Sequence, residues 1–487
     1  MDNHYDVLII GGGVVGSAVA RELARYDLQI GVLEKNLDVC YETSGRNTGV
    51  VHGGFAYTPG TWKAKLCVQG NKMMGDLSKE LGFDFRRSGK VLVGNTDEEY
   101  ASLLKTKAQG ERNGVEGLVM IDGKRLHELV PSVIGSFALF SSQSGIVDPF
   151  GLTIALAENA VHNGVCYHLD HEVTAIRRKG AEWQVEAGGE TFASRWVVNA
   201  SGLSCKKISD MLGFDHYRIV GSKDDYIILD DRLGSLVPMP IYTVPSNTYM
   251  GIHVSCTTDG NVLLGPTAED TDDLTHYGVE QKNIDLLVDS AKKIWPHFNR
   301  GDYIRTYSGI LPKWVDENGV IQDYKMEIRD DIAPHAVNLV GIESPGLTSA
   351  VPIALHVIDM MRERENLRER KDYDPIRKGF PRFDRLNPDE QAALIAENPD
   401  WGEVICRCRK VSKAEILHAI HNPLGVRTMT GVKYRARCMM GRCQGGYCQM
   451  RVAKLLEEEL ALKDTDLLYN RKGSWLFTGG CRDDGKA

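Results

Sequence analysis

The 487-residue chain has no long hydrophobic run. Its longest uncharged apolar stretch, residues 7–20, is interrupted by three consecutive glycines and is shorter than the roughly 20 residues that span a bilayer. The residues before it also lack the basic start of a secretory signal. We therefore expect no integral membrane segment and a cytoplasmic location, with any peripheral membrane contact made through a partner.

Basic charge is scarce as well, because 58 Lys and Arg residues stand against 66 Asp and Glu residues, which gives a net charge of −8. This balance argues against a nucleic-acid partner. Internal repeats and low-complexity tracts are absent. The composition, 42% apolar and 25% charged residues, is that of a globular protein with a sizeable core, and the length predicts at least two domains.

Three strand–glycine turn–helix segments lie far apart in the sequence. Their strands are expected at residues 5–10, 196–200 and 336–340, with helices from Val14 to about Arg25 and from about Leu347 to Met361. A single sheet assembled from separated pieces explains this spacing. The short alternating runs between residues 215 and 330 predict a second, mostly antiparallel layer.

The first of these turns has the spacing Gly11-x-Gly13-x-x-Gly16, and Glu34 follows at the end of the next strand. Gly11 permits a tight turn, Gly13 lets a pyrophosphate approach the backbone, and Gly16 lets the helix pack against the strand. The helix N-terminus then faces the phosphate charge. A Glu carboxylate in this position accepts hydrogen bonds from ribose hydroxyls. The pattern predicts a dinucleotide site, the alternative being an incidental glycine turn.

Residues 43–54, Thr-Ser-Gly-Arg-Asn-Thr-Gly-Val-Val-His-Gly-Gly, favour FAD over NAD as the dinucleotide. This segment resembles the second FAD contact of the D-amino-acid-oxidase-like flavoprotein superfamily. Residues 57–70 and parts of 251–266 resemble L-2-hydroxyglutarate dehydrogenases, and residues 341–348 resemble anaerobic glycerol-3-phosphate dehydrogenases. The resemblance covers about residues 4–365 and implies a Rossmann-type FAD-binding domain.

The resemblance also implies that the helix opening at Gly346, Leu347 and Thr348 points at the pyrimidine end of the flavin. There it stabilises the negative charge of the reduced form. A simple proline–glycine helix start is the alternative. The signature and the resemblance together give the candidate FAD-contacting residues: Gly11, Gly13, Val15, Gly16, Glu34, Lys35, Thr43, Ser44, Asn47, Gly49, Val50, His52, Val173, Ala200, Gly202, Gly309, Gly346, Leu347 and Thr348.

Oxidation of a C–OH or C–N bond by a flavin needs a base for the substrate proton, and a neutral His suits this role near pH 7. His52 lies beside the flavin-contacting glycines, and His253 lies in the stretch that resembles the dehydrogenases, so these two are the candidates. A structural role is the alternative for both. A covalent link to the flavin, which some superfamily members make, is a further alternative for His52.

An anionic substrate also needs cations. Membrane-type glycerol-3-phosphate dehydrogenases carry arginines where this chain has Phe55-Ala56 and Leu311, and both differences weaken the prediction of a phosphate site. Lys313, Lys65 and Arg305 are available to hold a carboxylate or phosphate instead. We place Lys313 among the catalytic candidates, and a solvated surface charge is the alternative for all three.

Five of the 11 cysteines crowd between residues 406 and 448. The pairs Cys406-x-Cys408 and Cys443-x₄-Cys448 depart from the CxxC pairs of structural zinc sites. They resemble the bacterioferritin-associated-ferredoxin-like module, in which four such cysteines hold a [2Fe–2S] cluster, with zinc as the alternative. Cys438 is left as a spare thiol. The flanking cations are expected to favour thiolates, and they are Arg407, Arg409, Arg437 and Arg442.

These segments predict a fold of class α/β plus α+β with a discontinuous first domain. Residues 1–90, 145–215 and 330–365 form the FAD-binding domain, 91–144 and 216–329 the substrate domain, 366–400 a linker, 401–455 the [2Fe–2S] module and 456–487 a tail. The tail begins with a helical pattern from Leu456 to about Leu468, contains Cys481, and has no assigned role.

The sequence therefore predicts an FAD-dependent dehydrogenase for a small anionic secondary alcohol, either glycerol 3-phosphate or a 2-hydroxy acid such as L-2-hydroxyglutarate. Hydride passes to flavin N5, and electrons are expected to leave through the cluster to a partner flavoprotein or other electron-acceptor subunit of a larger complex. Two alternatives stay open. One is an amino- or imino-acid dehydrogenase of the same superfamily, and the other is an electron-carrier or redox-sensing flavoprotein without its own substrate.

Overall fold

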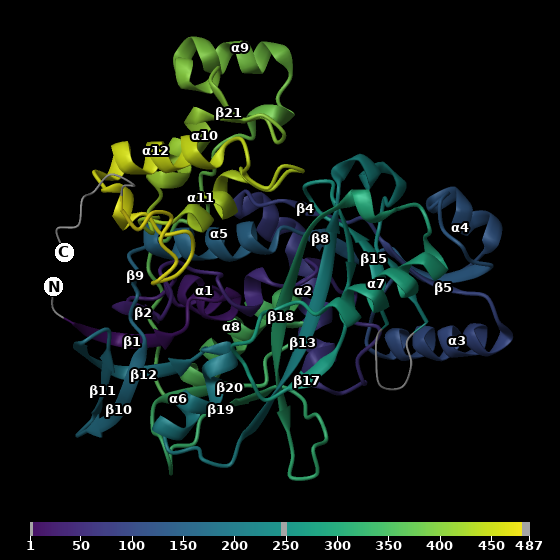
Figure 1. Ribbon diagram of the computed structural model, residues 1–487. Helices are drawn as coiled ribbons and strands as arrows, with labels where there is room; N and C mark the ends of the chain where they lie inside the picture. Colours follow the sequence, from purple (N-terminus) through teal and green to yellow (C-terminus); the bar gives the residue numbers. More distant parts are fainter. Residues whose placement is uncertain (1–2, 245–250, 480–487) are drawn as a thin grey trace.

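Two large sheets and a C-terminal helical module make up the computed structural model, which describes residues 3–244 and 251–479 (Figure 1). The strands of the first sheet are β1 His4–Ile10, β2 Ile30–Glu34, β9 Cys166–Leu169, β10 Val173–Lys179, β11 Glu182–Ala187, β12 Glu190–Asn199, β19 Lys325–Glu327 and β20 Ala336–Val340. Their order is β10-β11-β12-β1-β2-β9, with β20 beside β12 and β19 beside β20. Segments far apart in the sequence thus form one sheet, as predicted.

The central strand β1 is buried on both faces. It runs parallel to β2 and β12. Val7 and Ile9 pack against the helices α1 (Val14–Leu23), α5 (Pro149–His162) and α8 (Gly346–Arg362). Leu8 and Ile10 pack on the opposite face, where α6 (Cys205–Met211) lies. A strand covered on both sides needs the continuous apolar run that the sequence shows.

The second sheet is mostly antiparallel, as expected. Its strands are β5 Lys90–Gly94, β6 Leu118–Asp122, β7 Phe137–Ser141, β13 Arg218–Leu229, β14 Ile241–Thr243, β15 His253–Cys256, β16 Val262–Gly265, β17 Glu269–Thr271 and β18 Tyr303–Val315. They follow the order β17-β13-β16-β15-β14-β5-β7-β6, with β18 beside β13 and with β14 parallel to β5. The flanking helices are α3 Asp97–Arg112, α4 Gly123–Leu129 and α7 Gln281–Ile294.

A long helix and a small sheet join these two layers. Helix α2 (Trp62–Leu81) packs against α5 and α8 of the first layer. The small sheet consists of β3 (Val50–Val51), β4 (Phe85–Arg86) and β8 (Gly145–Val147). The two sheets use chain segments close to the predicted domain limits, and the limits themselves stay predictions. No helix in the described part of the chain combines the length and the apolar character that crossing a bilayer requires.

The cysteine-rich segment forms a small module that lies beside α5 (Figure 1). It contains the hairpin β21 (Val404–Cys406) and β22 (Val411–Ser412) and the helices α10 (Lys413–Ile420), α11 (Met429–Ala436) and α12 (Gln449–Leu460). Buried apolar side chains from all three helices form its own core. The module therefore folds around the cysteines rather than as an extension of either sheet.

Two expectations for this end of the chain need correction. The helix predicted from Leu456 to about Leu468 instead starts directly after Cys448 and ends at Leu460, because Ala461 turns the backbone left-handed with φ 51°. The predicted linker contains a helix, α9 (Pro388–Glu397), which the Asn387 side chain caps. Cys481 lies outside the described residues.

Candidate functional site

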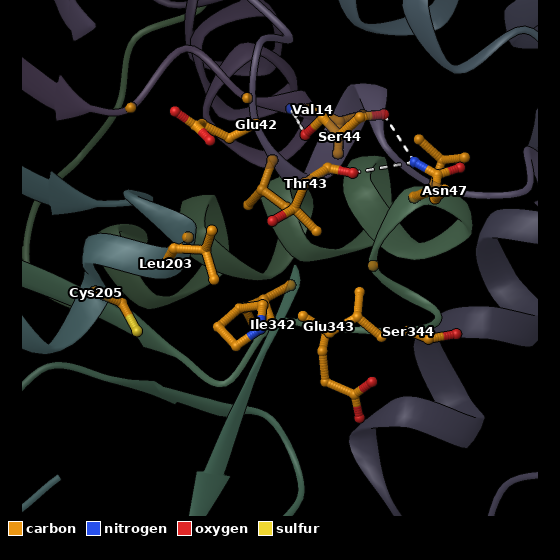
Figure 2. A pocket seen from close by; sticks show the side chains of 18 of the residues that line it. Val14, Glu42, Thr43, Ser44, Asn47, Leu203, Cys205, Ile342, Glu343 and Ser344 are labelled. Atoms are coloured by element: carbon orange, nitrogen blue, oxygen red, sulfur yellow. Dashed lines mark hydrogen bonds between the residues drawn. The ribbon is translucent and has the colours of Figure 1, made fainter. Parts of the chain in front are cut away.

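A cavity of about 450 Å³ lies between the two sheets (Figure 2). Gly11, Lys35 and Ala200 line it, so it meets the ends of β1, β2 and β12. The carboxyl ends of parallel strands are the usual ligand-binding edge of such sheets. His253 and other side chains of the second sheet line it as well. The cavity is therefore positioned to hold a cofactor on one sheet and a second ligand against the other.

The glycine turn after β1 forms a cradle in this cavity. Gly11 has φ +110°, and a Cβ there would lie 2.6 Å from the Ala200 carbonyl oxygen. A Cβ on Gly16 would lie 1.9 Å from the Gly11 carbonyl oxygen, which explains how α1 starts so close to β1. Glu34 lines the cavity, and its carboxylate accepts a hydrogen bond from the Gly12 N–H at 2.7 Å. These residues fit the phosphates and ribose of a dinucleotide.

The loop after β2 is tied to the start of α1. Ser44 Oγ accepts a hydrogen bond from the Val14 N–H at 3.0 Å (Figure 2). Asn47 Nδ2 donates to the carbonyl oxygens of Thr43 at 3.2 Å and Ser44 at 2.8 Å. Thr43, Ser44 and Asn47 all line the cavity. The loop thus presents hydroxyl and backbone groups to a cofactor from a fixed position.

Helix α8 brings a second helix N-terminus to the cavity. Gly346, Leu347 and Thr348 line it, and the Thr348 hydroxyl accepts a hydrogen bond from the His52 N–H at 3.1 Å. The positive end of the α8 dipole therefore faces the cavity beside His52. This arrangement suits the negative charge of a reduced flavin.

Most of the predicted cofactor residues come together here. Those that line the cavity are Gly11, Gly13, Val15, Glu34, Lys35, Thr43, Ser44, Asn47, Val50, His52, Val173, Ala200, Gly202, Gly346, Leu347 and Thr348. Gly16, Gly49 and Gly309 do not line it. A Cβ on Gly49 would lie 2.5 Å from Val147 O, and one on Gly309 would lie 2.0 Å from Arg46 O. These three glycines, Gly16 within α1, Gly49 before β3 and Gly309 within β18, therefore permit close backbone approaches beside the cavity.

Two histidines line the cavity, of which His253 is buried and His52 is half-buried. His253 Nδ1 lies 3.2 Å from the Gly251 carbonyl oxygen, which places the ring proton on Nδ1 and leaves Nε2 as an acceptor. This Nε2 has no hydrogen-bond partner among the described residues. Burial lowers the pKa of His253 to about 3 and the pKa of His52 well below its ordinary value, so both rings are neutral at pH 7. The Nε2 of His253 is itself buried at the cavity wall, which makes the ring a candidate general base for a substrate that binds against it.

A buried lysine lies behind this base. The Tyr242 ring stacks on His253 with centroids 3.8 Å apart, and Lys90 Nζ lies 4.3 Å from the Tyr242 centroid. Lys90 also lies 4.7 Å from the centroid of the Phe55 ring. It forms no ion pair within the described parts of the chain, and burial lowers its pKa to about 7. Sequence reasoning missed Lys90, because nothing near it marks the start of this strand as buried.

Charged side chains reach the cavity from several elements. Lys313 on β18 lines it, as predicted for a substrate-binding cation, and Asp224 on β13 faces it with a pKa that burial raises to about 8. Lys63, at the start of α2, also lines the cavity and pairs with Glu343. Asp224, Lys63 and Glu343 were not predicted.

Two cations proposed from the sequence lie elsewhere. Lys65 is exposed and its Nζ lies 4.8 Å from the Trp62 ring centroid. Arg305 is outside the cavity, and its guanidinium donates to Gln444 in the cysteine-rich module at 3.3 Å. Only Lys313 of the three proposed cations therefore meets the substrate end of the site.

The four candidate cluster cysteines lie together in the module. Cys406 Sγ is 3.9 Å from Cys408 Sγ, which is 3.8 Å from Cys443 Sγ, and Cys448 contacts Cys406. Two thiolates on one tetrahedral metal ion lie about 3.7 Å apart for metal–sulfur bonds of about 2.3 Å. The four sulfurs are thus spaced as thiolate ligands, and a [2Fe–2S] cluster, which spreads four thiolates over two irons, would use all of them.

Backbone donors complete this fit. The N–H groups of Met439 and Arg409 hydrogen-bond the Cys406 sulfur. Against the cost of burial, the N–H groups of Tyr447 and Gly445 lower the pKa of the Cys443 thiol. Donors of this kind stabilise the charge of a thiolate-bound cluster.

The arginines beside the cysteines were expected to favour thiolates, but three of them join the module to the rest of the chain. Arg409 pairs with Asp231 at 3.2 Å, Arg442 pairs with Asp230 at 3.1 Å, and Arg437 pairs with Asp148 at 3.3 Å and with Asp259. The aspartates belong to both predicted large domains. These arginines therefore fix the position of the module.

Comparison with known proteins agrees with this geometry. Residues 6–360 match the family described as FAD dependent oxidoreductase, and residues 404–458 match the BFD-like [2Fe-2S] binding domain. The chain belongs to the FAD-dependent oxidoreductase family. FAD and a [2Fe–2S] cluster are its cofactors, and the predictions of the fold, the enzyme class and both cofactors are confirmed.

Relatives refine this assignment. The glycerol 3-phosphate dehydrogenase of Caloramator mitchellensis is 35% identical over 99% of both chains. The mitochondrial L-2-hydroxyglutarate dehydrogenase of Nematostella vectensis is 30% identical over 75% of this chain and 92% of its own length. Among solved structures, FAD-bound L-alpha-glycerophosphate oxidase from Mycoplasma pneumoniae superposes with a TM-score of 0.72 at 26% identity, covering 78% of this chain and 99% of that one. This oxidoreductase is thus an FAD-dependent dehydrogenase related to glycerol-3-phosphate and 2-hydroxyglutarate dehydrogenases.

Proposed function

We propose that this dehydrogenase oxidises a small anionic secondary alcohol and passes the electrons through its cluster to a partner protein. The neutral, unpartnered Nε2 of His253, in a cavity that Lys313 and Lys63 also line, carries the proposal. Glycerol 3-phosphate is the first candidate substrate, because the relative of that name matches this chain through the module. The L-2-hydroxyglutarate dehydrogenase of Nematostella vectensis matches 75% of the chain and makes L-2-hydroxyglutarate the second candidate.

Each residue in the cavity has a distinct part in this proposal. His253 Nε2 takes the proton of the alcohol hydroxyl, since burial keeps the ring neutral at pH 7. FAD, when bound, would supply the acceptor for the hydride that leaves the carbon bearing this hydroxyl. Lys313 and Lys63 attract and orient the anionic group of the substrate as point charges. The cysteines at 406, 408, 443 and 448 hold the cluster through which single electrons leave.

Anaerobic mixing of the holoprotein with substrate tests this proposal. We expect glycerol 3-phosphate to bleach the flavin absorption, with L-2-hydroxyglutarate as the second-ranked substrate. Bleaching by amino acids such as L-proline, with none by either alcohol, would identify an amino-acid dehydrogenase. No bleaching by any of these, in a protein that dithionite reduces, would indicate an electron carrier.

Variants separate the roles of the side chains. His253→Gln should slow flavin reduction by about 10²–10⁴-fold. Lys313→Met and Lys63→Met should mainly raise the substrate concentration needed for half-maximal reduction. Lys65→Met is the matched control on α2, because Lys65 is exposed and outside the cavity, and it should change neither quantity.

A further inference from the structure

The cluster site is open to solvent on one side. Cys406 and Cys448 are buried in the module core, whereas Cys408 and Cys443 are exposed. A cluster held by these four thiols therefore comes to the surface at Cys408 and Cys443. The side chains around that opening form what we call the exposed corner, which consists of Arg407, Cys408, Cys443, Tyr447, Met450 and Arg451.

Four arginines near this opening differ in their partners. Arg409 and Arg442 face the large domains and form ion pairs with aspartates there. Arg407 and Arg451 are exposed, and neither forms an ion pair within the described residues. The protein as a whole has a net charge of −8, and these two exposed arginines place positive charge beside the cluster site.

An aromatic side chain organises the two free arginines. Their guanidinium carbons lie 4.4 Å (Arg407) and 5.1 Å (Arg451) from the Tyr447 ring centroid. Tyr447 is 37% exposed and Met450, on the first turn of α12, is 57% exposed. Tyr, Met and Arg are the residue types that protein interfaces favour, with aromatic and Arg anchors contributing most of the binding energy. The exposed corner thus has the composition of an interface.

We propose that the exposed corner docks an acidic protein with a one-electron redox centre. Arg407 and Arg451 attract the acidic face of that partner, while Tyr447 and Met450 pack against it beside Cys408 and Cys443. In each encounter one electron passes from the reduced cluster to the oxidised centre of the partner, and no bond forms or breaks. Two encounters remove the two electrons of one substrate oxidation. This inference rests on the proposed role of the cluster as the electron exit.

Two haem proteins of opposite charge test the docking surface. The holoprotein is reduced anaerobically with dithionite, freed of excess reductant and mixed with soluble cytochrome b5, which is acidic, or with cytochrome c, which is basic. Binding of oxidised cytochrome b5 to the oxidised holoprotein is measured separately by calorimetry. We expect cytochrome b5 to bind, and its reduction to slow by about tenfold or more as ionic strength rises, whereas cytochrome c should show no such loss.

Charge variants locate the contact. Arg451→Glu should weaken cytochrome b5 binding and slow its reduction by about tenfold at low ionic strength, and Arg451→Lys should restore both. Arg112→Glu makes the same charge change at the end of α3, far from the module in Figure 1, and should have no effect. Iron content and the visible spectrum confirm that each variant retains its cluster.

The outcomes distinguish this inference from the proposed function. Equal salt dependence with both cytochromes, or an Arg451→Glu variant that binds cytochrome b5 as the parent does, overturns the docking surface. If the docking surface is overturned in this way but the reduced protein still reduces a small uncharged dye, the cluster remains the electron exit. A reduced cluster that passes electrons to none of these acceptors overturns both.

Discussion

A buried ion pair joins the module to the predicted FAD-binding domain, and its contribution to the free energy of unfolding can be estimated from the structure. Arg435 on α11 donates two hydrogen bonds to Asp38, at 2.6 and 3.0 Å, and the two side chains are 3% and 2% exposed. Arg435→Met keeps the apolar bulk but leaves Asp38 as a buried, unpaired carboxylate. Glu158, which also contacts Arg435, keeps Arg377 as its partner at 2.7 Å. Removing one member of a buried pair costs about 3–5 kcal/mol.

Urea unfolding with two probes measures this cost. Flavin fluorescence follows the FAD-binding domain, and the visible absorption of the cluster follows the module. In Arg435→Met we expect the cluster signal to be lost at lower urea than the flavin signal. The free energy of that first transition should fall by about 3–5 kcal/mol relative to the parent protein.

Two controls make the argument refutable. Lys472 pairs with Asp170 at 2.7 Å, but the side chains are 73% and 38% exposed, so Lys472→Met should cost at most about 1 kcal/mol. Adding Asp38→Asn to Arg435→Met removes the orphaned charge and should recover much of the loss. A loss below about 1 kcal/mol in Arg435→Met, or no recovery in the double variant, would show that this pair does not hold the module.

Three further predictions concern the cofactors and the buried base. A Cβ on Gly70 would lie 1.9 Å from a carbonyl oxygen of α8, so Gly70→Ala should lower the free energy of unfolding by about 1–3 kcal/mol and release flavin on gel filtration. The control is Gly75→Ala, which should stabilise the same helix because the nearest atom to its Cβ would lie at 3.8 Å. His253 has a folded pKa of about 3 against an ordinary 6.5, so between these pH values only the unfolded chain binds this proton. The free energy of unfolding should therefore fall by up to about 1.4 kcal/mol per pH unit as the pH drops below 6.5. The urea midpoint of His253→Gln should fall less steeply with pH than that of the parent protein. Cys448→Ser should abolish the cluster, and Cys438→Ser should preserve it, as iron analysis would show; retained iron in the first variant would contradict the ligand set.

Local sequence patterns were sufficient to predict the parts of the fold in which one strand is followed directly by one helix. The strand expected at residues 336–340 is β20 with the same limits, and the helix expected from Val14 is α1. The glycine spacing predicted the turn between β1 and α1 because the required close approaches are short-range. Gly16, for example, meets the carbonyl of Gly11 only five residues earlier.

The substrate end of the cavity depends on long-range contacts, and there the sequence predicted less. Lys63 and Lys65 stand two residues apart on α2, yet only Lys63 shares the buried side of the helix with Leu66 and Cys67. Helical periodicity would have separated the two lysines. Asp224 likewise shares one face of β13 with other cavity-lining residues. The alternation of side chains along this strand could be predicted from the sequence, but which of its two faces lines the cavity could not.

The buried carboxylates of the large domains argue that the module is an integral part of this dehydrogenase. Asp38, Asp148 and Asp259 have side chains only 2%, 8% and 7% exposed, and the module supplies the cations that pair with them. Although burial opposes ionisation, Arg437 and Arg409 hold the pKa of Asp259 well below its ordinary value. Asp148 and Asp259 lie in the predicted FAD-binding and substrate domains, so Arg437 also joins these two domains to each other. In a chain without the module these three carboxylates would lose the cations that pair with them, and the electron exit is therefore coupled to the stability of the domains that form the substrate cavity.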